Sequence, residues 1–200
     1  MYAALAVIAA IGLALFAAAL YFDRGTTIRR KMRSVPLVGI ADIQEGQRAR
    51  VHGVPSGTPL LAPLSGRSCV YYAVVVEEEV VGQTRNYWVK TASEAQWTDF
   101  LLTDPSGQLH VLTTDAVAGA LFRSAQSGGF HVNEASMHAF LERQATKGIR
   151  IPSRPHRTVR MTEAILEIGT TIAVVGTVKG GRLQSVPGQA LWATDDIEFR

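Results

Sequence analysis

The chain has 200 residues, of which 47% are hydrophobic, and it carries a formal net charge of +3 and a single cysteine. One cysteine excludes a scaffold held by disulfides within the chain, and it agrees with a reducing compartment. Residues 23–33 hold a net charge of +4, which leaves −1 for residues 34–200. The basic pI is therefore a local feature, and it gives no reason to expect nucleic acid as a partner.

Residues 1–22 contain no charged side chain, and Gly12 is the one glycine among them. As a helix this stretch would be roughly 33 Å long, close to the hydrocarbon thickness of about 30 Å. We therefore expect a single transmembrane helix over residues 1–22. A cleaved signal peptide is the alternative, because Ala17, Ala18 and Ala19 resemble a cleavage site, although no basic residue precedes the apolar run.

A short basic segment follows the apolar run and predicts the topology. Its five basic residues, opposed only by Asp23, are Arg24, Arg29, Arg30, Lys31 and Arg33. The positive-inside bias places the N-terminus outside the cell and the rest of the chain in the cytoplasm, at the cell membrane. The same side chains could bind anionic lipid head groups, at about 1 kcal/mol each near the surface. A topology signal alone is the simpler interpretation.

Residues 23–46 are predicted to form a juxtamembrane segment and linker, in which Ser34 and Pro36 end any helix. Strand patterns begin after it: residues 47–57 alternate, and residues 68–82 are rich in β-branched and aromatic side chains. Residues 85–92 are the expected antiparallel partner of that second strand. Residues 97–114 contain two apolar runs around a Asp-Pro-Ser-Gly turn, which predicts a hairpin.

The second half of the chain mixes a helix with further strands. Residues 134–148 show helical spacing, residues 115–126 could hold a helical turn, and residues 161–200 are strands separated by glycines. Glycines at tight bends favour a small barrel or curled sheet. The predicted fold class is α+β: an N-terminal transmembrane helix, then a β-rich, barrel-like antiparallel domain over residues 47–200 with one or two helices inserted.

A set of residues spread over positions 50–180 is similar to the GIDE-type, or beside-a-membrane, domain. The residues that carry the resemblance are Ala62, Pro63, Leu64, Ser65, Gly66, Cys69, Tyr71, Tyr72, Asp104, Gly107, Glu163, Gly169, Val175 and Gly176. In eukaryotes this domain lies between the membrane helices of mitochondrial E3 ubiquitin ligases, and in prokaryotes it occurs alone. In the ligases, ubiquitin transfer depends on a RING domain with two zinc sites. One cysteine cannot supply those ligands, so a ligase activity inherited from the resemblance is unsupported.

Motifs for chemistry are weak in this sequence. No two of its five histidines have the HxxxH spacing of a helical zinc site, and the common phosphate, dinucleotide and hydrolase signatures are absent. Cys69 lies in an apolar strand, as inert thiols do, although a nucleophile is the other interpretation. Glu77, Glu78 and Glu79 cannot converge on a cation along one strand unless it bulges.

Five aromatic residues could line a binding groove, although strand aromatics more often pack in a core: Tyr71, Tyr72, Tyr87, Trp88 and Trp97. The sequence therefore predicts a single-pass, membrane-anchored adaptor or partner-binding protein that needs no cofactor or metal. Its expected partners are the membrane, an unidentified protein and anionic lipid head groups. The alternatives are a module that binds anionic lipid, and a transferase or other enzyme with an unrecognised site.

Overall fold

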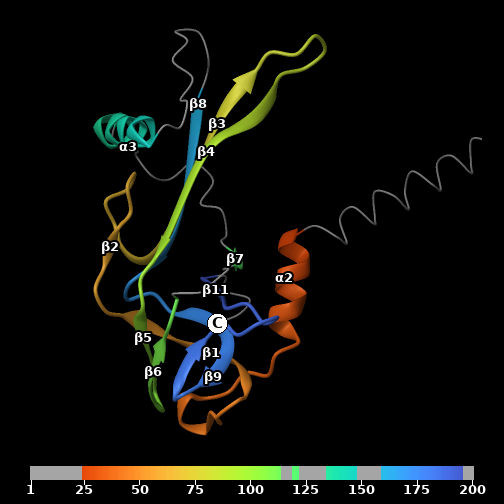
Figure 1. The fold of residues 1–200 in the computed structure, drawn as a ribbon, viewed down its shortest axis with the longest axis vertical. Coiled ribbons are helices and arrows are strands. Elements are labelled where there is room, and N and C mark those ends of the chain that lie inside the picture. Colours follow the sequence, from red (N-terminus) through yellow and green to blue (C-terminus); the bar gives the residue numbers. More distant parts are fainter. Residues whose placement is uncertain (1–23, 114–118, 122–133, 148–158, 196–200) are drawn as a thin grey trace, which may run out of the picture.

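The computed structural model describes residues 24–113, 119–121, 134–147 and 159–195. They form a small β-barrel from which a long, narrow sheet extends, with one helix against each of these two parts (Figure 1). The barrel lies at one end of the longest axis, and a hairpin of the sheet forms the other end (Figure 1).

Five strands close the barrel. Their order is β1 (Arg48–Ser56), β5 (Phe100–Asp104), β6 (Gly107–Val111), β10 (Arg182–Gln184) and β9 (Ile172–Lys179), and β9 pairs again with β1. The pairs are antiparallel except for β6 with β10, which is parallel. This circular order with its one parallel pair is that of an OB-fold, a five-stranded Greek-key barrel.

Strand β1 closes the barrel because it bends and pairs on two sides. Residues 48–53 pair with β9, and residues 54–56 pair with β5. Gly53 lies where one partner gives way to the other, and a Cβ there would lie 2.7 Å from the Thr103 carbonyl oxygen. Glycine at this bend therefore lets the two backbones approach. Alternate residues of β1, including the fully buried Ala49 and Val51, fill the barrel core.

The second sheet is built on β3 (Ser68–Val80), whose β-branched and aromatic residues favour a long strand. Along most of its length it pairs with β4 (Tyr87–Trp97) on one side and β8 (Val159–Glu167) on the other, and near its start it pairs with the short β2 (Leu60–Leu61). Strand β3 leaves the barrel and runs to the far end of the molecule with β4 and β8 beside it (Figure 1). The hairpin predicted from residues 68–92 and the hairpin predicted from residues 97–114 are confirmed.

The helices occupy different places. Helix α3 (Glu134–Thr146), confirmed within residues 134–148, buries Phe140 against one face of the second sheet. Helix α2 (Arg24–Arg33) ends before Ser34, as expected, and packs on the barrel. A 3-10 turn, η1 (Ile40–Asp42), and two short parallel strands, β7 (Gly119–Leu121) and β11 (Trp192–Thr194), complete the described elements.

The predicted fold class, α+β with an N-terminal transmembrane helix followed by a β-rich, barrel-like antiparallel domain with one or two helices inserted, is wrong. The part that the structure describes is mostly β, and its barrel includes a parallel pair. The segment predicted to hold a second inserted helix contributes strand β7 where it is described. Apolar content and spacing along the chain could not reveal strand pairing between residues as distant as His110 and Arg182.

None of the helices in the described ranges is long and apolar enough to span a bilayer. The predicted transmembrane helix, residues 1–22, lies outside the described residues. The linker predicted at residues 23–46 contains α2. After α2 it runs alongside β1, because Val38 N–H donates to the Arg50 carbonyl and Arg50 N–H donates to the Pro36 carbonyl.

The bend in β1 yields a test of barrel closure. Gly53→Ala should lower the free energy of unfolding by about 1–3 kcal/mol, because its methyl group has to displace the β5 backbone. Gly39→Ala is the control, since its nearest neighbours lie at 3.4 Å. Urea unfolding in detergent would measure both. Equal stability of the two variants would contradict this account of the bend.

Candidate functional site

Helix α2 is fixed to the barrel by a small apolar contact. Met32 is fully buried and packs with Val35 on Ala173 and Val175, two residues of the outer face of β9, with Trp192 beside them. The inner face of β9 faces the barrel core, which includes Ile172 and Val174. Both faces of β9 are therefore covered, which explains its nearly continuous apolar sequence. The helix is held in one orientation against the barrel.

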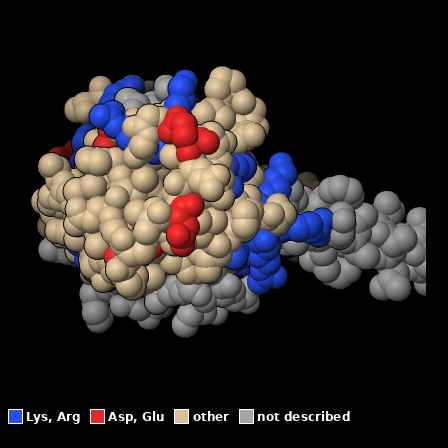
Figure 2. All heavy atoms as spheres, turned by 90° about the horizontal axis from the view of Figure 1, so that it is seen from below, with Lys and Arg blue, Asp and Glu red and all other residues tan. Residues whose placement is uncertain are grey.

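The basic side chains of α2 lie around this contact. Arg30, Lys31 and Arg33 are exposed, whereas Met32 between them is buried. Arg29 is half-buried, and the side chain of Arg24 lies outside the described part. One of the two groups of Lys and Arg side chains in Figure 2 lies on the right flank, the side on which α2 lies in Figure 1. The structure thus brings the predicted lipid-binding residues onto one docked helix.

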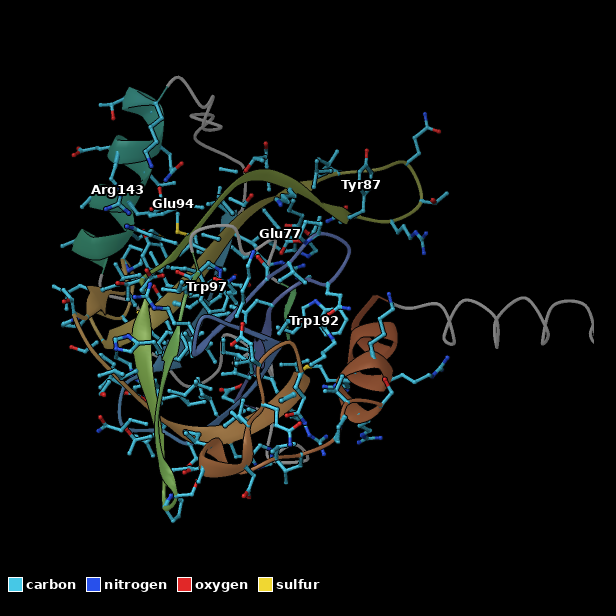
Figure 3. All side chains as sticks on the ribbon, turned by 60° about the horizontal axis from the view of Figure 1, so that its bottom comes forward. Glu77, Tyr87, Glu94, Trp97, Arg143 and Trp192 are labelled. Carbon is cyan, nitrogen blue, oxygen red and sulfur yellow. The ribbon has the colours of Figure 1, made fainter. Side chains whose placement is uncertain are left out.

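The barrel adds its own cations to this side. Lys31 and Arg48 both approach the Trp192 ring, with 5.9 Å from Lys31 Nζ and 5.2 Å from Arg48 Cζ to the ring centroid. Trp192 lies beside α2 in Figure 3. Arg48 also donates to the Ala190 carbonyl at 3.0 Å. We call Arg29, Arg30, Lys31, Arg33, Arg48 and Trp192 the basic face. Sequence reasoning missed Arg48 and Trp192, because only the fold brings them to α2.

His52 lies on the outer side of β1, two residues beyond Arg50. Burial, together with the positive charge of Arg50, lowers the pKa of His52, so its imidazole is neutral at pH 7. It therefore adds no charge beside the basic face at physiological pH. His110 is on β6 and His138 on α3, so the described histidines come from three different elements.

The loop that carries much of the GIDE resemblance, residues 62–66, is held by Glu163 of β8. The Glu163 carboxylate accepts hydrogen bonds from the Leu64 N–H at 2.7 Å and the Ser65 N–H at 3.0 Å. Gly66 ends the loop with a φ of 70°, a conformation that favours glycine. The matching residues Pro63, Leu64, Ser65, Gly66 and Glu163 thus form one structural unit.

Cys69 is buried, and its Sγ lies 3.6 Å from the Leu60 carbonyl oxygen. Burial, and then the nearby Glu163 carboxylate, raise the pKa of its thiol to about 11. A thiolate is the nucleophilic form of cysteine, and very little is present at neutral pH with such a pKa. This environment favours a structural role for Cys69 over a role as a nucleophile.

The aromatic residues proposed for a groove are divided between separate surroundings. Tyr71 packs in the barrel core with its ring centroid 4.1 Å from that of Trp97. Tyr72 points into the other core, under α3, and donates to Glu94. Tyr87 is exposed near the far end of β4. These side chains do not line a common groove.

Asp104 and Gly107 stabilise the turn between β5 and β6. Asp104 accepts hydrogen bonds from the Ser106 and Gly107 N–H groups, and from the Ile40 N–H of η1 at 2.9 Å. Partial burial would raise the pKa of Asp104, but these hydrogen bonds outweigh it and lower that pKa. The turn is therefore fastened to the segment that links α2 with β1.

The remaining glycines of the resemblance have two different roles. Gly169 has a φ of 85° in the turn between β8 and β9. At Gly176, a Cβ would lie 2.8 Å from Leu183 Cγ and from Leu191 Cδ1, so this glycine makes room for core leucines. Like the residues of the 62–66 loop, these two glycines therefore have structural roles.

Glu94 joins α3 to β4 and was not singled out from the sequence. Its carboxylate accepts hydrogen bonds from Tyr72 Oη at 2.7 Å, Gln144 Nε2 at 2.6 Å and Lys147 Nζ at 2.5 Å, and Arg143 lies at 3.4 Å. Arg143 and Glu94 lie together beside α3 in Figure 3. Burial would raise the pKa of Glu94, but these donors lower it to about 2. A lone Glu in a strand gave no signal of this role.

The run Glu77–Glu79 does not form a cation site. Glu77 pairs with Arg160 at 2.7 Å, Glu78 is buried, and Glu79 accepts a hydrogen bond from Asn86 Nδ2. Within the described ranges no group of three His, Cys, Asp or Glu side chains could hold a metal ion.

Comparisons of the chain with protein-family models, curated proteins and solved structures find no match.

The environment of Cys69 predicts slow thiol chemistry. In the folded protein at pH 8, Cys69 should react with a disulfide reagent at least a hundred times more slowly than in urea, because the thiol is buried and its pKa is raised. Absorbance of the released thiolate would measure both rates. Fast labelling in the native state would instead favour a reactive nucleophile.

The Glu94 network predicts a pH dependence of stability. The folded-state pKa lies near 2, below the usual 4.5, so the contribution of Glu94 is complete above about pH 4.5 and is lost as the pH falls toward 2. Glu94→Gln should lower stability at pH 7 by about 1.5–3 kcal/mol and flatten this acid dependence. Urea unfolding from pH 2 to 7 would show it, with the exposed Glu142→Gln as the control. Parallel pH curves for wild type and Glu94→Gln would count against the network.

Proposed function

We propose that this chain is a membrane-tethered, partner-binding protein whose barrel is held by α2 against the cytoplasmic surface of the cell membrane. The docking of α2 is the observation that carries the proposal. Buried Met32 fixes the helix to β9, while Arg30, Lys31 and Arg33 remain exposed around it. The uncharged apolar residues 1–22 directly precede this helix in the sequence, and they would supply the attachment.

Binding of anionic lipid head groups is a second function that the basic face supports. A disordered basic linker would attract an anionic surface equally well in any orientation. The cations of α2 and Arg48 are instead gathered on one side of a folded unit, with Trp192 among them. Tryptophan is enriched at membrane interfaces, and each basic residue near an anionic surface contributes about 1 kcal/mol.

The GIDE-like character of the domain is part of the same proposal. Its support is that the matching residues hold the 62–66 loop, the β5–β6 turn and the packing of β9 in place, as the scaffold of a domain would require. The activity proposed here is recognition of a partner. The ligase-like alternative has no comparable support, because one cysteine cannot supply the zinc ligands of a RING domain. For an enzyme with a thiol nucleophile, the raised pKa of buried Cys69 is unfavourable.

The test uses the full chain in native membranes extracted as lipid nanodiscs. Wild type should remain in the membrane after alkaline washing and should carry more anionic lipid than the bulk membrane. Arg30→Glu/Arg33→Glu should lose that enrichment, since two cations correspond to about 2 kcal/mol, or roughly thirty-fold in lipid affinity. Lipid mass spectrometry provides the measurement.

Lys179→Glu/Arg182→Glu is the matched control, because it reverses two exposed charges at the β9–β10 turn, beyond the part of β9 that contacts α2. This variant should keep the enrichment. Release of the wild-type chain by alkaline washing would refute the tether. Equal lipid composition in both charge variants would refute a role for the basic face.

A further inference from the structure

The free end of the β3–β4 hairpin exposes large apolar side chains. Val81 is 80% exposed, Tyr87 52% and Val89 40%. They lie at the end of the narrow sheet that extends furthest from the barrel, and Tyr87 is on that arm in Figure 3. We call residues 80–90 the hairpin tip. Isolated exposed apolar residues are common, but three of them on one projecting turn form a patch.

A β-bulge in β4 sets the direction in which these side chains point. Val76 pairs with Ala92 and Glu77 pairs with Lys90, so Thr91 is the extra residue, and its Oγ1 donates to the Val76 carbonyl at 3.2 Å. Beyond the bulge, Val89 is opposite Glu78 and Tyr87 is opposite Val80. By strand alternation, both lie on the face that α3 covers nearer the barrel. That apolar face thus continues past α3 to the exposed tip.

The charge of the hairpin tip is positive. Residues 80–90 include Arg85 and Lys90 and no acidic residue. Of the acidic residues just before the tip, Glu77 pairs with Arg160 and Glu78 is buried, whereas Glu79 accepts a hydrogen bond from the neutral Asn86 amide and keeps its negative charge. Arg160 also lies over the Trp88 ring, at 4.2 Å from its centroid. The tip therefore combines aliphatic, aromatic and basic side chains, the composition of a surface at a membrane interface.

The hairpin leans toward the right in Figure 1, so its end, and not the sheet face that α3 covers, lies on the side of the basic face. In Figures 1 and 3, which differ by a rotation about the horizontal axis, the hairpin tip and α2 both lie to the right of the barrel, and α3 lies to the left. Figure 2 shows one group of Lys and Arg side chains on this right flank and another at the upper left. One flat surface on this side could reach both elements.

We propose that the hairpin tip inserts Val81 and Tyr87 into the head-group region of the same bilayer that α2 faces. This inference rests on the membrane-tethered function proposed above and extends it to a second contact. Two separated contacts would fix the orientation of the barrel over the lipid surface, whereas a single tether would let it rotate. The aromatic ring of Tyr87 and the cation of Arg85 suit the interface, and Val81 gains from leaving water.

A bilayer fits this tip better than an added strand from a protein. The bulge at Thr91 interrupts the regular ladder of β4, and bulges on edge strands discourage pairing with another chain. Gly82 allows a tight turn, because a Cβ at this position would lie only 2.4 Å from the Arg85 carbonyl oxygen. The compact turn presents side chains at its end and offers little backbone for pairing.

The experiment measures the depth of a fluorescent probe in full-length protein reconstituted into vesicles of phosphatidylcholine and phosphatidylglycerol. Val81→Cys carries an environment-sensitive nitrobenzoxadiazole label, and Ala145→Cys, exposed on α3, is the matched control. Cys69 remains, because it is buried, and labelled wild type gives the background. Lipids with a nitroxide near the head group should quench the probe at position 81 at least twice as strongly as the probe at position 145.

A second variant tests the chemistry of the contact. Tyr87→Asp, with the probe at position 81, should reduce the quenching to the level of position 145, because a carboxylate is repelled by the anionic surface. Equal quenching at positions 81 and 145 in vesicles that retain the protein would overturn the tip contact alone. Failure of the unlabelled chain to float with the vesicles would instead overturn the proposed tether, and this inference with it.

Discussion

The double pairing of β1, with β9 along one half and β5 along the other, is the constraint on which the architecture depends. It closes five strands into a barrel, and closure leaves no free edge among them. It also turns the outer face of β9 toward α2 and places Arg48 of β1 beside Trp192. Because Gly53 lies at the change of partner, the geometry of the basic face depends on one close backbone approach.

In the second sheet, carboxylates attach the neighbouring helix, loop and strand end. Glu94 attaches α3 to β4, Glu163 holds the 62–66 loop against β8, and Arg67 pairs with Glu167 at the barrel end of that strand. Each carboxylate accepts hydrogen bonds from groups distant in sequence, so these contacts depend on the pairing of the strands. An apolar core under α3, around Phe140, completes the attachment of the helix to the sheet. The second sheet is thereby packed against α3 along part of its length, and the exposed hairpin tip lies beyond this contact.

The side chains that usually carry chemistry are used here for structure. Cys69 is buried with a raised pKa, Asp104 fastens a turn, and the three consecutive glutamates are paired or buried. Recognition is the activity that the exposed features fit: cations and an indole on one docked helix and barrel, and an apolar, basic tip on the same side. In the proposed function, two such surfaces would let the domain contact a bilayer at two separate places.

By itself, the sequence determined the local features of this protein: the strands within residues 47–57 and 68–114, the helix from Glu134, the end of α2 before Ser34, and the charge-free run ahead of it. These features follow from side-chain alternation, β-branching and proline, which act over a few residues. Only the tertiary structure decided the circular strand order, the parallel pairing of His110 with Arg182, the place of Glu94 and the meeting of Lys31, Arg48 and Trp192. Those features depend on contacts between distant segments, for which spacing along one chain carries no signal.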